Sequence, residues 1–225
     1  MGSIQYPAAI TRPDIAKAAS LLAEFSKGPA IEHQRAADQV LRYLADTKRL
    51  SICFDGNHRP VFEAFSDASL GDDTRTRKSS QGFVIKLFGG AIDWQATRQK
   101  TVSTSSTEAE FKALAEAAKE LIRWKRVFKA TKLEIDEEFS IWCDNQQTIR
   151  LLTAETPKLV TKLRYVDIHH HWLREQVQNG EIEVSYVKSS DMAADGLTKA
   201  LPRQKQEAFV RQLGIEVIHT TEASS

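Results

Sequence analysis

The spacing of apolar residues changes near residue 61, and this change limits the folds that the chain can adopt. Before that point, apolar residues recur at the three- and four-residue spacing of helices. After it, three short strand-like runs separated by turn residues precede helical segments that alternate with strands. This order predicts a helical segment followed by a mixed α/β unit whose first strands are antiparallel.

The individual elements follow from the same spacing and from turn residues. We predict a first helix that Asp14 caps and that ends at Lys27-Gly28-Pro29, and a second helix that ends near Asp46. Strands are predicted at 50–54, 61–66, 82–88, 91–95, 139–143 and 182–187. Further helices are predicted at 105–129, 146–153, 164–178 and from about 192 to Pro202, before an amphipathic stretch that reaches Gly214.

These elements divide the 225 residues into three parts. Residues 1–56 are predicted to form a helical segment, residues 57–218 the α/β domain, and residues 219–225 a flexible tail. The chain has 41% hydrophobic and 27% charged residues, a composition that excludes disorder, collagen and disulfide scaffolds. Because the formal net charge is +1, any site for a polyanion must be local.

The cysteines, the apolar runs and the first residues bear on the expected location. The two cysteines, Cys53 and Cys143, are too few for a disulfide framework and suit a reducing compartment. No apolar run approaches the roughly 20 residues of a membrane helix, and the first residues lack the pattern of a signal peptide. We therefore expect no membrane partner and a cytoplasmic or nuclear location.

Two aspartates directly follow strands that we predict to be buried. Asp67 follows Phe65-Ser66, and Asp144 follows Ile141-Trp142-Cys143. A buried carboxylate is costly unless it is paired, hydrogen-bonded or bound to a metal, and converging carboxylates repel one another unless cations neutralise them. An oxygen-only ligand set suits Mg²⁺ or Mn²⁺. The two strand ends together predict one metal site, although a turn cap or a surface charge explains either aspartate alone.

Four ordered motifs extend this pattern. They are Phe65-Ser66-Asp67-Ala68-Ser69, Ser105-Ser106-Thr107-Glu108-Ala109-Glu110-Phe111, Trp142-Cys143-Asp144-Asn145-Gln146 and Ala194-Asp195-Gly196-Leu197-Thr198-Lys199. Together they resemble ribonuclease H, and most closely the ribonuclease H domain at the end of copia-type retrotransposon polyproteins. The N-terminal segment, with Thr11-Arg12-Pro13-Asp14-Ile15-Ala16, resembles the end of the preceding reverse transcriptase. The resemblance covers about residues 3–215.

This resemblance implies a fold, an activity and a site. The fold would be a ribonuclease H-like five-stranded mixed sheet, flanked by helices, with its first three strands antiparallel. The activity would be endonucleolytic hydrolysis of the RNA strand of RNA–DNA hybrids by two Mg²⁺ ions, for which Mn²⁺ would substitute, leaving 5′-phosphate products. The catalytic residues and metal ligands would be Asp67, Glu110, Asp144 and Asp195.

The second motif contains two glutamates, and only one of them can face the sheet. Glu108 and Glu110 are two positions apart, which places them about 200° apart around a helix. Glu110 stands next to Phe111, as the family's metal-binding glutamate does, so we assign it to the site. Glu108 is then an acid in the first turn, where the helix dipole favours negative charge.

Basic and polar residues near these motifs are candidates for contact with the hybrid. Residues 74–101 contain six basic residues and one acidic residue, a pattern that a charge-protected hairpin edge would also show. Candidates in this region and beside the carboxylates are Ser69, Arg77, Lys78, Arg98, Lys100, Ser105, Asn145 and Gln146. Those next to the carboxylates could read the 2′-hydroxyl of RNA, or be polar turn residues. Ser105 could cap the long helix or present its amides to a phosphate.

Some features depart from the family pattern or leave other functions open. The loop Lys188-Ser189-Ser190-Asp191 lacks the histidine that cellular ribonucleases H carry there, and Gly196 stands where the family usually has Ile. His169-His170-His171 cannot chelate one ion from a regular helix, because adjacent side chains point in different directions. The alternatives to catalysis of hybrid cleavage are a non-catalytic hybrid-binding or assembly module co-opted from a retrotransposon, and a nuclease for DNA or a resolvase on the same fold.

The expected partners and location follow from the same resemblance. The Tyr-x-Asp-Asp motif of the polymerase appears nowhere in the sequence, so the chain carries no polymerase site. The reverse transcriptase part of the same polyprotein is therefore an expected partner beside the hybrid. The location would be the cytoplasm, in a virus-like particle, or the nucleus. The sequence does not indicate an oligomeric state.

Overall fold

The computed structural model describes residues 2–54, 61–154 and 164–218, with the side chains of 136–138 and 164–170 excepted. The predicted flexible tail at 219–225 lies outside the described residues. Within the described part of the chain, no helix combines the length and apolarity needed to cross a membrane.

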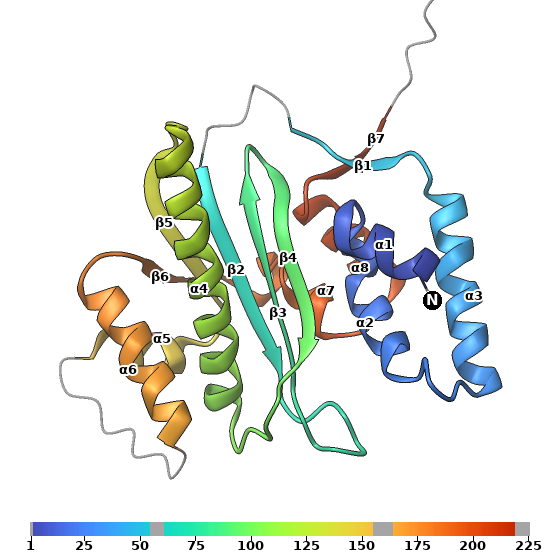
Figure 1. Cartoon of the computed structure of the whole chain (residues 1–225), viewed down its shortest axis with the longest axis horizontal. Helices are drawn as coiled ribbons and strands as arrows, with labels where there is room; N and C mark the ends of the chain where they lie inside the picture. Colours follow the sequence, from blue (N-terminus) through green and yellow to red (C-terminus); the bar gives the residue numbers. More distant parts are fainter. Residues whose placement is uncertain (1, 55–60, 155–163, 219–225) are drawn as a thin grey trace, which may run out of the picture.

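A five-stranded sheet forms the centre of the molecule, in the order β4-β3-β2-β5-β6 (Figure 1). Its strands are β2 (Val61–Ser69), β3 (Ser80–Leu87), β4 (Gly90–Arg98), β5 (Asp136–Cys143) and β6 (Glu183–Tyr186). The first three strands are antiparallel, whereas β5 runs parallel to β2 and β6 runs parallel to β5. The predicted fold class, a mixed sheet flanked by helices, is confirmed.

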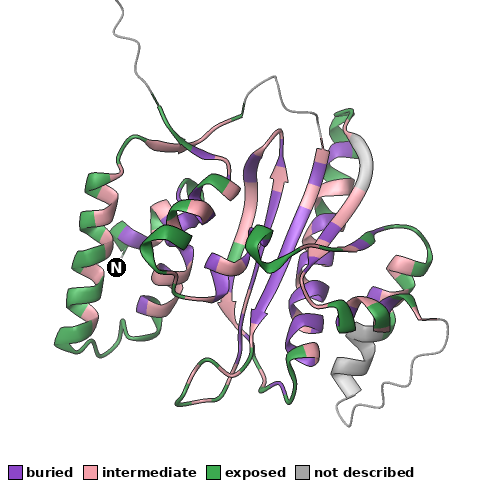
Figure 2. Ribbon diagram, turned by 180° about the vertical axis from the view of Figure 1, so that it is seen from behind, coloured by how far each residue is buried: buried purple, intermediate pink, exposed green. Residues whose placement is uncertain are grey.

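The two faces of the sheet are covered by different helices. Helix α4 (Ser106–Thr131) packs on β2 and β3, and its buried face forms the main core with Phe62, Ile85 and Ile141. Helices α5 (Gln146–Thr153) and α6 (Arg164–Gln178) pack beside α4. The opposite face is covered by α7 (Asp195–Thr198) and α8 (Arg203–Gln212), and the sheet between the two layers is largely buried (Figure 2).

The C-terminal part differs from the predicted helix that runs from about 192 to Pro202. The chain instead forms a 3₁₀ turn, η2 (Ser189–Asp191), and the four-residue α7. Close packing fixes α7 in place, because a Cβ on Gly196 would approach the ring of Phe209 to 2.4 Å. On β3, a Cβ on Gly82 would approach Leu197 Cβ to 2.6 Å. The sequence alone does not show which distant residues fill these spaces.

The N-terminal segment contains α1 (Gly2–Ile10), the 3₁₀ turn η1 (Pro13–Ile15), α2 (Ala16–Glu24) and α3 (Ile31–Asp46). Helix α1 was not predicted; Pro7 lies inside it, and Ile4 and Ala8 are its buried residues. The predicted cap by Asp14 is wrong: Ile15 occupies the N-cap of α2 and no side chain caps it. The Asp14 carboxylate instead accepts hydrogen bonds from Arg12.

The N-terminal segment is attached to the rest of the chain by strand pairing and by hydrogen bonds. Strand β1 (Leu50–Ile52) pairs with β7 (Ile215–Val217), so the two strands of this small sheet come from either side of residue 56. The indole of Trp94 donates to the carbonyl of Ala8 at 2.7 Å, and the amide of Gln206 donates to that of Asp14 at 2.9 Å. The division at residue 56 stays a prediction.

Candidate metal centre

The carboxylates of Asp67, Glu110 and Asp144 converge at one edge of the sheet. β2 and β5 are parallel, so Asp67 near the end of β2 and Asp144 just after β5 reach the same edge. Glu110 comes to this edge from the first turns of α4. One oxygen from each residue lies within 4.8 Å of the others, and we call this group the carboxylate cluster. This short separation suits ligands of a shared cation.

Burial gives the carboxylate cluster a high electrostatic cost. Asp67 is 1% exposed and Glu110 is 5% exposed. Burial, followed by the nearby Asp67 and Asp144, raises the pKa of Glu110 to about 9. Burial also raises the pKa of Asp67, a rise that Lys199 and Thr198 partly oppose. Without a cation, the protein therefore holds Glu110 in its protonated form near neutral pH.

One oxygen of the carboxylate cluster has no partner. Glu110 Oε1 accepts the backbone amide of Ala68 at 3.4 Å, whereas the buried Oε2 accepts no hydrogen bond from any residue that the structure describes. An orphaned buried oxygen beside two other carboxylates is the donor arrangement that a hard divalent cation prefers. The described residues thus fit Mg²⁺ or Mn²⁺, which oxygen ligands bind well.

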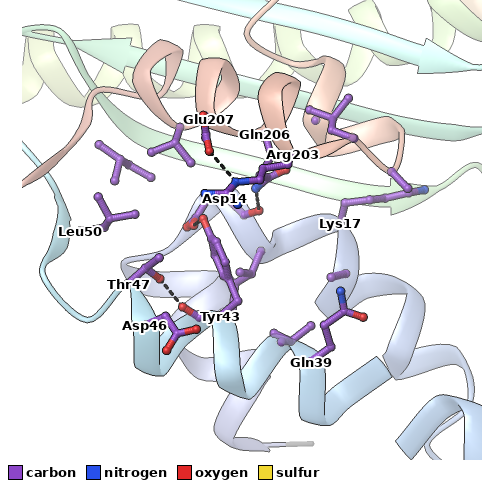
Figure 3. Close-up of a pocket in the computed structure, with 18 of the residues that line it drawn as sticks. Asp14, Lys17, Gln39, Tyr43, Asp46, Thr47, Leu50, Arg203, Gln206 and Glu207 are labelled. Carbon is purple, nitrogen blue, oxygen red and sulfur yellow. Dashed lines mark hydrogen bonds and ion pairs between the residues drawn. The ribbon is translucent and has the colours of Figure 1, made fainter. Parts of the chain in front are cut away.

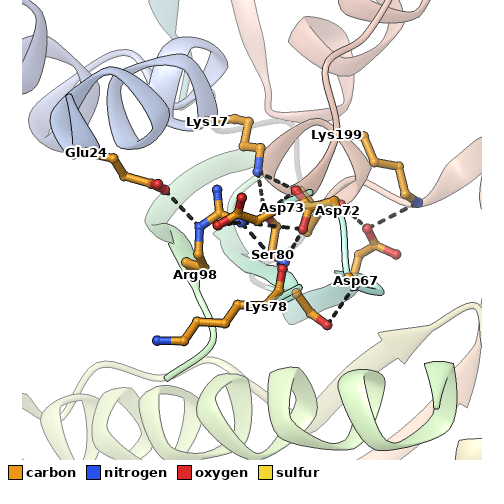
Figure 4. A network of polar contacts seen from close by, with 12 residues as sticks. Lys17, Glu24, Asp67, Asp72, Asp73, Lys78, Ser80, Arg98 and Lys199 are labelled. Atoms are coloured by element: carbon orange, nitrogen blue, oxygen red, sulfur yellow. Dashed lines mark hydrogen bonds and ion pairs between the residues drawn. The ribbon is translucent and has the colours of Figure 1, made fainter. Parts of the chain in front are cut away.

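Asp195, the fourth predicted ligand, is connected to the carboxylate cluster by Lys199. The Lys199 ammonium pairs with Asp195 Oδ1 and lies 3.3 Å from Asp67 Oδ2 (Figure 4). The Thr198 hydroxyl donates to the same oxygen of Asp67. Burial would lower the pKa of Lys199, but the adjacent Asp67 and Asp195 raise it, so the ammonium stays charged. The structure thus brings all four predicted carboxylates to one region.

Glu108 has partners of its own outside the carboxylate cluster. Its Oε2 accepts the amide and hydroxyl of Thr104 at 2.8 and 2.7 Å, and its Oε1 pairs with Lys112 at 2.7 Å. Burial alone would raise the pKa of Glu108, but these contacts bring it below its usual value. Its amide also donates to Ser105 Oγ, which caps α4. Glu108 therefore has a structural place at the start of the helix.

Several of the predicted substrate residues form contacts within the protein. Arg98 forms ion pairs with Glu24 at 2.9 Å, Asp73 at 3.7 Å and Asp72 at 3.8 Å. Figure 4 shows this network beside Asp67 and Lys78. Arg77 and Lys100 are exposed, and Gln146 is exposed at the start of α5. Ser69 is half-buried at the end of β2.

Two predicted substrate residues cap helices. Ser105 accepts the amide of Glu108 at 3.1 Å, and Asn145 accepts the amide of Thr148 at 3.0 Å. These contacts satisfy helix N-terminal donors and need no ligand. Contact of the eight predicted residues with nucleic acid stays a prediction.

Sequence reasoning assigned no role to three residues that contact the predicted ligands. Lys199 and Thr198 contact Asp67, and Ser189 Oγ donates to Asp144 Oδ2 at 2.7 Å. The pair of Lys199 with Asp195 could have been expected from the sequence, because Lys199 follows Asp195 by four residues, which is about one helical turn. No such local spacing points to Ser189, since its contact with Asp144 spans 45 residues of chain.

A separate cleft of about 1310 Å³ lies between the N-terminal helices and α8 (Figure 3). Its described lining includes Tyr43 and Leu50 on one side and Gln206 and Val210 on the other. None of the residues that line it belongs to the carboxylate cluster. Lys199, which pairs with Asp67 and Asp195, does line it, so the cleft reaches the side of the candidate metal centre.

Comparison with known proteins finds long matches among transposon proteins. The chain is 36% identical over 215 residues to the retrovirus-related Pol polyprotein from transposon TNT 1-94 of Nicotiana tabacum, covering 96% of this chain and 16% of the relative. It is 33% identical over 215 residues to the retrovirus-related Pol polyprotein from transposon RE2 of Arabidopsis thaliana, covering 96% and 15%. The chain thus spans less than a fifth of these relatives.

The other comparisons add a solved structure. LC11-RNase H1 in complex with RNA/DNA hybrid matches with 15% sequence identity and a TM-score of 0.45, covering 61% of this chain and 94% of that one. No protein-family model matches the chain.

Proposed function

Because the chain belongs to the family of retrovirus-related Pol polyproteins from transposons, we propose that it hydrolyses the RNA strand of RNA–DNA hybrids by a two-metal mechanism. The observation that carries the proposal is the convergence of Asp67, Glu110 and Asp144 within 4.8 Å from three separate elements. Buried carboxylates without matching cations are rare unless they bind a ligand.

Each carboxylate has a distinct role in this proposal. Asp67, Glu110 and Asp144 would hold the ions together with Asp195, and Asp67 is our candidate for a ligand that both ions share. Mg²⁺ ions held there, or Mn²⁺ in their place, would supply an activated water and stabilise the departing 3′ oxygen. Glu110 must lose its proton to bind, because burial raises its pKa to about 9. Ser189 would orient Asp144 through its hydrogen bond.

Substrate binding would use the residues around the carboxylate cluster. Arg77 and Lys100 are exposed and would contact phosphates, which would make affinity dependent on salt. Lys78 would join them, with Arg98 and Ser105 at the rim. Ser69, Asn145 and Gln146 would approach the 2′-hydroxyls that distinguish RNA from DNA. The reverse transcriptase part of the same polyprotein is the proposed protein partner, in a cytoplasmic virus-like particle or in the nucleus.

The test is cleavage of a labelled RNA–DNA hybrid in Mg²⁺, in Mn²⁺ and in EDTA, beside duplex DNA and duplex RNA. The wild type should cut only the RNA strand of the hybrid, only with metal, and leave 5′ phosphates that a 5′-phosphate-dependent exonuclease digests. Asp144→Asn should abolish cleavage. Asp93→Asn is the control, because Asp93 contacts Arg123 and Trp124 and lies outside the carboxylate cluster.

Two results would overturn the proposal. A folded wild-type protein that binds the hybrid in Mg²⁺ without cutting it would identify a non-catalytic hybrid-binding module. Cleavage of duplex DNA at a rate equal to that of the hybrid would identify a DNA nuclease on the same fold.

A further inference from the structure

Lys199 is the cation that the structure places against the predicted metal ligands. Among the residues that the structure describes, it is the only lysine or arginine that forms an ion pair with any of the four carboxylates. Its contacts are 3.3 Å to Asp67 Oδ2 and a shorter one to Asp195 Oδ1. One ammonium therefore connects a ligand from β2 with a ligand from α7. Figure 4 shows Lys199 beside Asp67.

Local geometry explains why Lys199 reaches both carboxylates. Lys199 follows Asp195 by one helical turn, and its backbone amide donates to the Asp195 carbonyl at 3.0 Å. An acid four residues before a lysine is the favourable order for such a pair. Neighbouring Thr198 directs its hydroxyl to Asp67, which anchors the end of α7 to β2. The backbone thus brings Lys199 beside both carboxylates, and its ammonium pairs with each of them.

The charges at the site do not balance without a further cation. Up to four carboxylates face a single ammonium, and like charges at this distance repel strongly when they are buried. The exposure of the two partners also differs: the Asp67 side chain is 1% exposed, whereas that of Lys199 is 41% exposed. Asp67 therefore cannot leave the site, but the lysine has an open route toward solvent.

We propose that Lys199 is a positioning residue, the internal counter-cation of the metal-free site, and that a divalent cation displaces its ammonium toward solvent on binding. This inference rests on the proposed function, because it assumes that Asp67 and Asp195 are metal ligands. In the metal-free protein the ammonium keeps these two carboxylates together. When a divalent cation binds, the same positive charge repels it. Lys199 therefore lowers the affinity for the metal, while it keeps the ligands in place before the metal binds.

The experiment compares wild type, Lys199→Gln and Lys199→Arg by thermal unfolding in EDTA and by calorimetric titration with Mg²⁺ alone. Lys199→Gln should unfold at a lower temperature in EDTA, since two carboxylates lose their counter-charge. It should also bind Mg²⁺ at least about tenfold more tightly, because one competing positive charge is gone. Lys199→Arg keeps the charge and should stay near the wild type in both measurements.

Lys125→Gln is the matched control, because Lys125 forms an ion pair of 2.7 Å with Glu181, and its side chain is exposed to a similar extent, 34%. It should leave Mg²⁺ affinity unchanged. Unchanged or weaker Mg²⁺ binding by a folded Lys199→Gln protein would overturn the inference, as would the same tightening in Lys199→Arg. If either of these results is found while the wild type binds Mg²⁺ and cuts the hybrid, only this inference fails and the proposed function stands. A wild type that binds no Mg²⁺ overturns both.

Discussion

Two buried acidic sites in this molecule differ in how their charge is balanced. In the N-terminal segment, the Asp14 carboxylate accepts two hydrogen bonds from Arg12, at 2.9 and 2.8 Å, and one from Tyr43 at 2.7 Å. In the carboxylate cluster, by contrast, Glu110 leaves one buried oxygen without any partner. The first site pairs one anion with one cation, whereas the second collects several anions around a single lysine.

This difference separates a structural site from a ligand site. A buried ion pair with all its hydrogen bonds made connects elements and needs nothing more. Burial and Asp14 raise the pKa of Tyr43 to about 12, which keeps its phenol a hydrogen-bond donor. Surplus buried carboxylates instead make the metal-free state costly, and that cost is recovered when a cation binds. Burial of an acid alone therefore does not indicate function; the missing partner does.

The largest expected effect distinguishes the two glutamates of α4. Glu110→Gln should lower hybrid cleavage by about a thousandfold or more, because a ligand of the reacting metals is lost. Glu108→Gln is the control two residues away and should keep cleavage within a few fold. It should lower stability by about 1 kcal/mol, since contacts with Thr104 and Lys112 weaken. Single-turnover cleavage and thermal unfolding measure the two effects; equal loss of cleavage in both variants would contradict this assignment.

The second prediction breaks the balanced site. Arg12→Met should destabilise the protein by about 3 kcal/mol, because it leaves the Asp14 carboxylate buried without its cation. Arg203→Met is the control, since the pair of Arg203 and Glu207 is exposed and should contribute less than about 1 kcal/mol. Chemical denaturation gives both values. Cleavage per folded molecule should change in neither variant. Equal destabilisation by the two variants would show that the buried ion pair stabilises the protein no more than the exposed pair does.

The third and smallest expected effect is a pH dependence that only the unbalanced site should show. The folded-state pKa of Glu110 is about 9, above its ordinary value, so the metal-free protein binds a proton there that the unfolded chain releases. The proton on Glu110 therefore stabilises the metal-free folded state. This stabilisation is complete at acid pH, below the ordinary pKa of a glutamate, and is lost as the pH rises through about 9. Mg²⁺ must displace the proton, so its affinity should rise by up to about tenfold per pH unit between pH 7 and 9.

Calorimetry in buffers of different ionisation enthalpy measures the released proton directly. In Glu110→Gln this proton is absent, so the variant should show a weaker pH response than the wild type over the same range, although burial also raises the pKa of Asp67. A wild-type affinity that does not change with pH would show that Glu110 is already ionised without metal.

Much of the sheet was predictable because its signals are local. The strands from Val61 to Trp94 alternate with turn residues, and the apolar run before Asp144 indicates a buried strand. The motifs also singled out Glu110 over Glu108, and the structure brings Glu110 to Asp67 and Asp144. Its role as a ligand stays a prediction, as do those of the other carboxylates and the substrate residues.

The features that the sequence did not predict correctly share one physical cause. Asp14 has the pattern of a helix cap, but its carboxylate forms an ion pair with Arg12 and accepts a hydrogen bond from Tyr43, which lies 29 residues away. In α7, Gly196 must fit against Phe209, which no local pattern reveals. The pairing of β1 with β7 joins residues more than 160 positions apart. Each outcome depends on contacts between distant parts of the chain.

The sequence by itself therefore determined the order of the five sheet strands and of the helices between them, the positions of the acidic residues at strand ends, and the family to which the chain belongs. These depend on periodicity and on motifs, which are properties of neighbouring residues. Only the tertiary structure decided which carboxylates are balanced and which are not. That balance depends on burial and on partners such as Lys199, and both arise only when distant segments pack together.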